Sequence, residues 1–204
     1  MVVPVVADAD TLFGGTTRGL LIHLDYQGLI RLHWSPLILD EVSRALVQTG
    51  RKADRATADR HEALMRAALP QAEVPTADVQ AQFEAVAWAM RSAKDIHVAA
   101  CAHVVLTKHY YPDAPVVSLV TKNIRDFGVR KLATLGIEVQ RPDAFLSELI
   151  ANDEPGVAAA FAALRATLRS NPTPDQLLER LAADGQTDTA AALLAAWQAG
   201  AVPL

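Results

Sequence analysis

The feature that most constrains the fold is the alternation of short β-branched runs with segments of helical spacing in the first 140 residues. Residues 2–7, 30–34, 116–120 and 137–139 have the length and composition of buried strands. Strands that alternate with helices normally pair in parallel, because each helix carries the chain back to the end of the sheet at which the previous strand began. We therefore expect an α/β fold with three layers, α/β/α, around a mostly parallel sheet.

The expected helices follow from the spacing of apolar residues and from capping signals. They cover residues 17–27, 57–69, 76–91, 96–106 and 129–135, with a further helix that starts at Ser35-Pro36. After Asp143 the pattern becomes helical only and rich in alanine. Thr173-Pro174-Asp175-Gln176 has the pattern of a capping box, Gly185 ends that helix, and a last helix runs over residues 188–199. We expect a domain of residues 1–148 and a helical extension of residues 149–204.

Composition excludes several classes of protein. Hydrophobic residues make up 51% and charged residues 21%, as in a packed globular chain rather than a disordered one. No apolar stretch approaches the ~20 residues of a membrane helix, and the N-terminus lacks a basic start, so we expect no membrane contact and a cytoplasmic location. The single Cys101 cannot form an internal disulfide, which fits a reducing compartment.

The formal net charge of -4 argues against a protein that binds nucleic acid through bulk electrostatics. Residues 1–150 carry 16 Lys and Arg against 17 Asp and Glu, whereas residues 151–204 carry 3 against 6. The excess acid therefore lies mostly in the tail. The most basic stretch runs from Arg44 to Arg60.

The acidic residues fall at positions that the predicted fold brings together. Asp8, Asp10, Asn123 and Asp126 follow strands, whereas Glu41 and Asp95 begin helices. In open α/β sheets, the carboxyl ends of strands and the amino ends of the following helices line the ligand crevice. Carboxylates that share a crevice repel one another unless a cation compensates, and hard oxygen ligands select Mg²⁺ or Mn²⁺.

Each acid also has a purely structural explanation. Asp8, Asp10 and Asp95 could cap helices, and Glu41 in a first turn would suit the helix dipole. Capping accounts for any one of these residues taken alone. It accounts less well for all of them at one edge of the sheet.

Four segments resemble the PIN domains, and particularly the VapC-type toxins of bacterial toxin–antitoxin pairs. The segments are Val-Val-Ala-Asp-Ala-Asp-Thr-Leu (5–12), Ser-Pro-Leu-Ile-Leu-Asp-Glu-Val (35–42), Lys-Asp-Ile-His-Val-Ala-Ala-Cys-Ala (94–102) and Val-Thr-Lys-Asn-Ile-Arg-Asp-Phe (120–127). They occur in the order and spacing of that family, and the tail resembles the helical extension of its longer members.

The resemblance implies a metal-dependent endoribonuclease with an RNA substrate, a cognate antitoxin and a homodimeric state. It implies that Asp8, Glu41, Asp95 and Asp126 hold Mg²⁺ or Mn²⁺ and act in catalysis. Asp10, Thr121 and Asn123 would then help to position water or the scissile phosphate. Such ions lower the pKa of an attacking water and stabilise charge on the phosphate. The basic stretch from Arg44 to Arg60 could then contact RNA phosphates, or it could form a solvated helix face.

Other candidate residues are better explained by packing. His97 and His103 are six residues apart and lack the spacing of a helical zinc pair, so core or surface roles are expected for both. Cys101 lies in an apolar helix. Trp34, Trp88 and Trp197 are scattered, and we expect them to pack rather than to stack on bases.

Three rival functions remain open on the sequence. Asp8-Ala9-Asp10-Thr11-Leu12 resembles the start of haloacid-dehalogenase-type phosphatases, but the glycine expected after the second Asp and the late acidic pair are missing. A receiver-like domain could use Lys122, yet no strand followed by an Asp turn lies in mid-chain. A PIN fold that binds RNA without cutting it is the third rival, and metal-dependent turnover would separate it from a nuclease.

Overall fold

The computed structural model describes residues 2–204 and divides into two compact units. The first contains the residues up to Phe13 together with Arg31–Gln140, and the second contains Gly14–Ile30 together with Arg141–Leu204. Neither unit is one continuous piece of chain. Within residues 2–204, no helix is long and apolar enough to cross a bilayer. The expected boundary between residues 148 and 149 stays a prediction.

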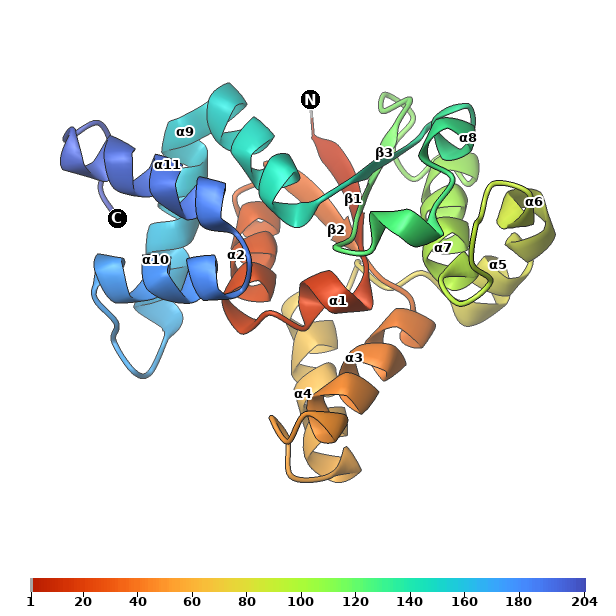
Figure 1. Cartoon of the computed structure of the whole chain (residues 1–204), viewed down its shortest axis with the longest axis horizontal. Coiled ribbons are helices and arrows are strands. Elements are labelled where there is room, and N and C mark those ends of the chain that lie inside the picture. Colours follow the sequence, from red (N-terminus) through yellow and green to blue (C-terminus); the bar gives the residue numbers. More distant parts are fainter. Residues whose placement is uncertain (1) are drawn as a thin grey trace. The chain divides into compact units, whose positions relative to one another are not determined.

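The sheet has four parallel strands in the order β2-β1-β3-β4 (Figure 1). The strands are β1 (Val3–Ala7), β2 (Ile30–His33), β3 (Val117–Val120) and β4 (Ile137–Gln140). The pairing of Ala7 with Val120, and of Val120 with Gln140, aligns the carboxyl ends of β1, β3 and β4. The α/β fold with a parallel sheet and a C-terminal helical region is thereby confirmed, and it is consistent with three α/β/α layers.

Seven α-helices and one 3-10 helix accompany the sheet in the first unit. They are α1 (Ala9–Leu12), α3 (Pro36–Gln48), α4 (Arg55–Ala68), α5 (Thr76–Gln80), α6 (Phe83–Ala87), α7 (Ile96–Thr107), η1 (Ile124–Asp126) and α8 (Val129–Ala133). The most apolar of them, α7, packs on β1, β3 and β4. The single helix expected over residues 76–91 is wrong: the chain forms two short helices that break at Ala81 and Gln82, where the Gln82 carboxamide oxygen lies 2.9 Å from His103 Nδ1 of α7.

The second unit is built of four helices, and its Ile30 begins strand β2. The helices are α2 (Gly15–Tyr26), α9 (Pro142–Thr167), α10 (Pro174–Ala183) and α11 (Thr187–Gln198). Helix α9 packs against α2 and α11 and is kinked at Asp153, which lies just before Pro155. The expected capping box of α10 is present, since Thr173 and Gln176 bond reciprocally.

Two helices of this unit receive their N-terminal caps from other helices. The N-cap residues of α2 and α11, Gly14 and Gln186, make no side-chain cap bond of their own. The Asp184 carboxylate accepts instead from the amides of Thr16 and Thr17, at 2.8 and 2.9 Å. The Asp143 carboxylate likewise accepts from the amides of Asp188 and Thr189. These contacts satisfy amides that a helix leaves without partners at its start.

Replacing Asp143 by alanine should destabilise the second unit by about 1–2 kcal/mol, the usual cost of a lost cap. Burial raises the pKa of Asp143, but bonds from the Thr189 hydroxyl and from backbone amides outweigh it, so the pKa is lowered from 3.8. The stabilisation is thus present above pH ~4 and lost as the pH falls through the lower pKa of the folded state.

Urea unfolding at pH 7 and pH 3, followed by helical circular dichroism, measures this effect. Glu179→Ala, which removes an exposed acid of α10, is the control. The capping role would be contradicted if the free energies of unfolding of wild type and Asp143→Ala differed as much at pH 3 as at pH 7.

Candidate functional site

The site begins where β1 and β3 end side by side. The Asp8 amide donates to the Val120 carbonyl at 2.9 Å, so these two strand ends are tied together. Asp8 is 5% exposed, and its carboxylate accepts from the Ala9 amide at 2.6 Å and from the Thr121 hydroxyl at 2.8 Å. Part of the capping explanation therefore holds for Asp8, whose other oxygen is directed at the end of β3.

Asp10 is held against the same strand end. Its two carboxylate oxygens lie 3.1 and 3.0 Å from the Lys122 amide, and one of them lies 3.3 Å from the Thr121 hydroxyl. Thr121 is fully buried and also accepts from the Asn123 amide at 3.0 Å. The Thr121 hydroxyl therefore joins both aspartates of the first motif to the start of the last motif.

A second group of acids lies around Asn123. The Asn123 amide group donates to Asp95 at 3.3 Å and also to Asp126. Asp95 is the N-cap residue of α7 but makes no side-chain cap bond, so the capping explanation is wrong for this residue. Its carboxylate is directed at Asn123 and Asp126 instead.

Glu41 reaches the site through His97. His97 Nε2 lies 3.3 Å from Glu41 Oε2, and the imidazole is the main cause that lowers the pKa of Glu41. The expectation that Glu41 lies in a first turn is wrong, because α3 begins at Pro36 and has no acid in its first turn. The neighbouring Asp40 points elsewhere and pairs with Arg44 and Arg55.

The two central aspartates have strongly raised pKa values. Burial, followed by the charge of Asp10, raises the pKa of Asp8 from 3.8 to about 7. Burial, a hydrogen bond that protonated Asp95 donates to Asp126, and the charges of Asp126 and Glu41 raise the pKa of Asp95 to about 6. The negative charges at this site are thus only partly compensated by the protein.

His97 belongs to this site, although its sequence spacing suggested a core or surface role. Burial lowers its pKa, but Glu41, Asp8 and the Lys94 carbonyl outweigh that effect and raise it. The spacing between His97 and His103 carries no information about the contact of His97 with Glu41. The available signal was position: His97 lies two residues after Asp95, in the first turn of the same helix, where side chains face the strand ends.

The oxygen donors at this site have the chemistry of a Mg²⁺ or Mn²⁺ site, and an added cation would relieve the repulsion that raises the two pKa values. Within residues 2–204, however, no three His, Cys, Asp or Glu side chains lie close enough together to hold a metal ion. Hydrogen bonds within the protein occupy these acids instead. The Asn123 amide group lies between Asp95 and Asp126, and Asp8 and Asp10 are bonded to the end of β3.

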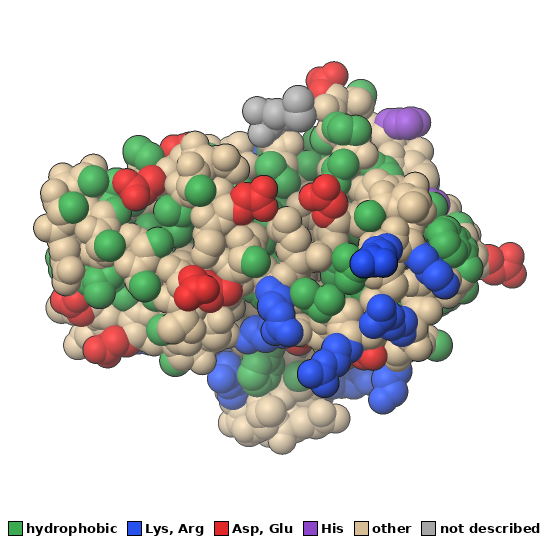
Figure 2. All heavy atoms as spheres, turned by 45° about the horizontal axis from the view of Figure 1, so that its top comes forward, with side chains coloured by type: hydrophobic (Ala, Val, Ile, Leu, Met, Phe, Trp, Pro, Cys, Tyr) green, Lys and Arg blue, Asp and Glu red, His purple; other side chains and the backbone are tan. Residues whose placement is uncertain are grey.

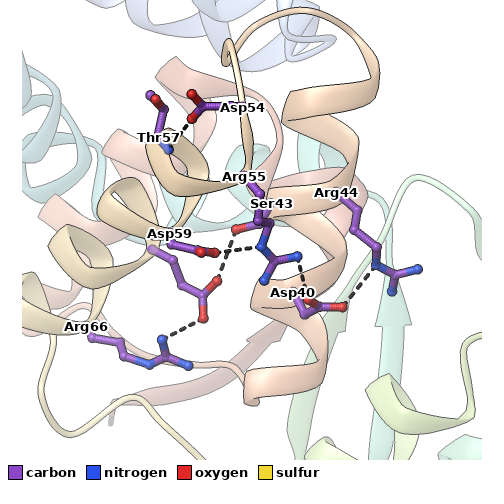
Figure 3. Close-up of polar contacts among 9 residues, drawn as sticks. Asp40, Ser43, Arg44, Asp54, Arg55, Thr57, Asp59 and Arg66 are labelled. Atoms are coloured by element: carbon purple, nitrogen blue, oxygen red, sulfur yellow. Dashed lines mark hydrogen bonds and ion pairs between the residues drawn. The ribbon is translucent and has the colours of Figure 1, made fainter.

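In the basic stretch from Arg44 to Arg60, Arg44 and Arg55 are paired with acids (Figure 3). Arg55 pairs with Asp40 at 2.7 Å and with Asp59 at 2.6 Å, and Arg44 pairs with Asp40 at 2.9 Å. For Arg44 and Arg55, these ion pairs favour the role of a solvated helix face over contact with RNA phosphates.

The other candidate residues divide into buried and exposed ones. Cys101 and Trp34 are completely buried, which confirms packing roles for both. Trp88 is 51% exposed, so the expectation of a packing role is wrong for Trp88. Trp88 follows the last residue of the short helix α6. The chain after Trp88 turns away to pair with residues 126–128, which leaves the Trp88 ring facing solvent.

Comparison with known proteins identifies one segment. Residues 142–195 match the family model of the VapC50 C-terminal domain. The match covers α9, α10 and most of α11, and it includes both aspartates that cap helices of the second unit. Neither a search of the curated proteins nor a search of the solved structures found a match.

Proposed function

The VapC50-type C-terminal domain at residues 142–195 supports a VapC-type toxin, and from this premise we propose that the chain is a metal-dependent endoribonuclease. The proposed reaction is hydrolysis of RNA phosphodiesters with Mg²⁺ or Mn²⁺. The observation that carries the proposal is the chain of hydrogen bonds that links Asp8, through Thr121 and Asn123, to Asp95 and Asp126. The pKa values of Asp8 and Asp95 in this chain are raised.

We assign Asp8, Glu41, Asp95 and Asp126 as the metal-holding residues. A bound divalent ion would supply an activated water and would stabilise charge on the phosphate. Glu41 is oriented by His97, so it can direct an oxygen towards Asp95 and accept a proton from the attacking water. The Asn123 amide would release Asp95 and Asp126 to the ion and become free to donate to a phosphate oxygen.

Asp10 and Thr121 would act close to substrate in this scheme. Asp10 fixes the Lys122 amide, and Thr121 orients Asp8 by donating to it. Their roles in positioning water or phosphate are part of the proposal.

The partners follow from the premise. An active toxin requires a cognate antitoxin that masks it, and we propose an antitoxin protein, a homodimeric state and a cytoplasmic location for this chain. The VapC50-type segment supports the antitoxin in particular.

The phosphatase rival is disfavoured by the surroundings of Asp8. A nucleophilic carboxylate has to reach the substrate phosphorus, whereas Asp8 is 5% exposed and both its oxygens accept hydrogen bonds from the protein. Nothing comparable argues against an RNA-binding protein without catalysis, so turnover has to decide between these two.

The test is incubation of purified protein with a panel of structured and single-stranded RNAs in Mg²⁺, Mn²⁺ or EDTA, with p-nitrophenyl phosphate as a parallel substrate. We expect RNA cleavage that requires the metal and no release of nitrophenol. Binding of RNA without cleavage in either metal would support the binding-only rival, and nitrophenol release would support the phosphatase.

A further inference from the structure

A groove of about 610 Å³ lies beside the acidic site in the first unit. It is lined by Ala89, Met90, Arg91, Gly128, Val129, Arg130 and Lys131. Its floor is apolar, and its cationic side chains are exposed. Because Asp126 and Gly128 are two residues apart, the groove and the acidic site share one segment of chain.

Backbone contacts fix the groove to the site. The amides of Arg91 and Ser92 donate to the Asp126 carbonyl at 2.9 and 3.2 Å, and the Gly128 amide donates to the Ala89 carbonyl at 2.8 Å. A Cβ atom at Gly128 would lie 2.3 Å from the Ala89 oxygen, so only glycine permits this approach. The two walls of the groove are therefore held together at the position of Asp126.

The charge of the groove is positive and not compensated locally. Within residues 2–204, Arg91, Arg130 and Lys131 form no ion pair with a carboxylate, in contrast to Arg44 and Arg55. The space-filling view shows Lys and Arg side chains gathered on one part of the surface (Figure 2). A groove of this charge fits a polyanion.

An exposed aromatic ring adjoins the cations. The Lys131 ammonium lies 5.7 Å from the centre of the Trp88 ring and donates to the Trp88 carbonyl at 2.8 Å. The Trp88 indole nitrogen donates to the Ala85 carbonyl at 2.9 Å, so the ring is held in place while 51% of the residue stays exposed. A fixed aromatic surface next to cations is the combination that binds unpaired nucleobases and their phosphates.

We propose that this groove binds the single-stranded RNA segment that flanks the scissile phosphate. Trp88 stacks on a base, and Arg91 and Arg130 contact phosphates. This inference deepens the proposed nuclease function and rests on it for the identity of the neighbouring site. It favours RNA over an acidic protein segment because a protein partner would not require the exposed indole ring beside the cations.

The test is fluorescence anisotropy of a labelled single-stranded RNA of about ten nucleotides, within the usual site size of such proteins. Binding is measured in EDTA, where no metal-dependent cleavage can occur. Trp88→Ala should weaken binding roughly 5- to 150-fold, the usual effect of removing one stacked base. The double variant Arg91→Ala/Arg130→Ala should reduce the slope of log K against log salt by about 0.7 for each lost phosphate contact.

The matched control is Arg44→Ala/Arg55→Ala, which removes the same charge from the ion-paired stretch of α3 and α4. We expect this variant to bind RNA like wild type. Equal weakening in both double variants would overturn the groove assignment, as would unchanged RNA binding in the groove variants. Poly-glutamate serves as a second probe, in place of an acidic protein segment. Groove variants that lose poly-glutamate binding but keep RNA binding would overturn the RNA assignment in favour of a protein partner.

The proposed RNA-binding groove and the proposed nuclease activity can fail independently of each other. Groove variants that bind and cleave like an active wild type would refute the groove and leave the nuclease intact. Groove-dependent RNA binding by a wild type that cuts no RNA would refute the nuclease and retain the groove as an RNA site.

Discussion

Replacing Asp95 by asparagine should lower the rate of metal-dependent RNA cleavage by about 100- to 1,000-fold, because several kcal/mol of transition-state stabilisation depend on a correctly held ion. Asparagine keeps the shape of the side chain and removes its charge. Asp95 is the most sensitive position because its carboxylate interacts with those of Asp126, Glu41 and Asp8.

The measurement is the initial rate of cleavage at saturating Mg²⁺, with Asp8→Asn as a second variant. Asp59→Asn serves as the control, since it neutralises an exposed acid of α4 in the same unit. Circular dichroism and thermal unfolding verify that each variant is folded. A folded Asp95→Asn protein that cleaves RNA at the wild-type rate would refute the assigned site.

Replacing Asp8 by asparagine should stabilise the metal-free protein at pH 8 by on the order of 1–4 kcal/mol, although the same change removes activity. The pKa of Asp8 is raised to about 7 in the folded state, against 3.8 as its ordinary value. The folded state therefore favours the protonated carboxyl. Stability from this group is complete below pH ~4 and is lost as the pH rises through about 7, where folding has to accommodate a buried charge.

Unfolding by urea in EDTA at pH 4 and pH 8 measures this effect. We expect Asp8→Asn and wild type to differ little at pH 4, because both side chains are then neutral, and the variant to be the more stable protein at pH 8. Asp59→Asn should show no comparable dependence on pH. An Asp8→Asn protein that is less stable than wild type at pH 8 would show that the buried carboxylate is already compensated.

The strands and most helices could be predicted because their signals are local. Residues 2–7 and 116–120 are β-branched runs bounded by polar turns, and both form buried strands within a residue of the expected bounds. The fold class then brought the ends of β1 and β3 together, which made Asp8 and Asn123 candidates for one site. The resemblance to VapC-type toxins, supported at residues 142–195, was carried by motifs at those same strand and helix ends.

The remaining features depend on contacts between distant parts of the chain. The groove forms where residues 89–91 meet residues 128–131. The sequence of neither segment indicates that it contacts the other. His97 gains its place only when α3 brings Glu41 to it. The break between α5 and α6 is similar, since the helical spacing of residues 76–91 continues through Gln82 and only the contact with His103 marks the interruption.

The caps supplied by other helices become available only late in the synthesis of this protein. Helix α2 has 12 residues, which is marginal for an isolated helix in water, and its capping carboxylate lies 168 residues later in the chain. At ~5–20 residues per second, Asp184 leaves the ribosome roughly 10–30 s after Thr16. Throughout that interval α2 lacks this cap, and a chain truncated before Asp184 would leave α2 without it.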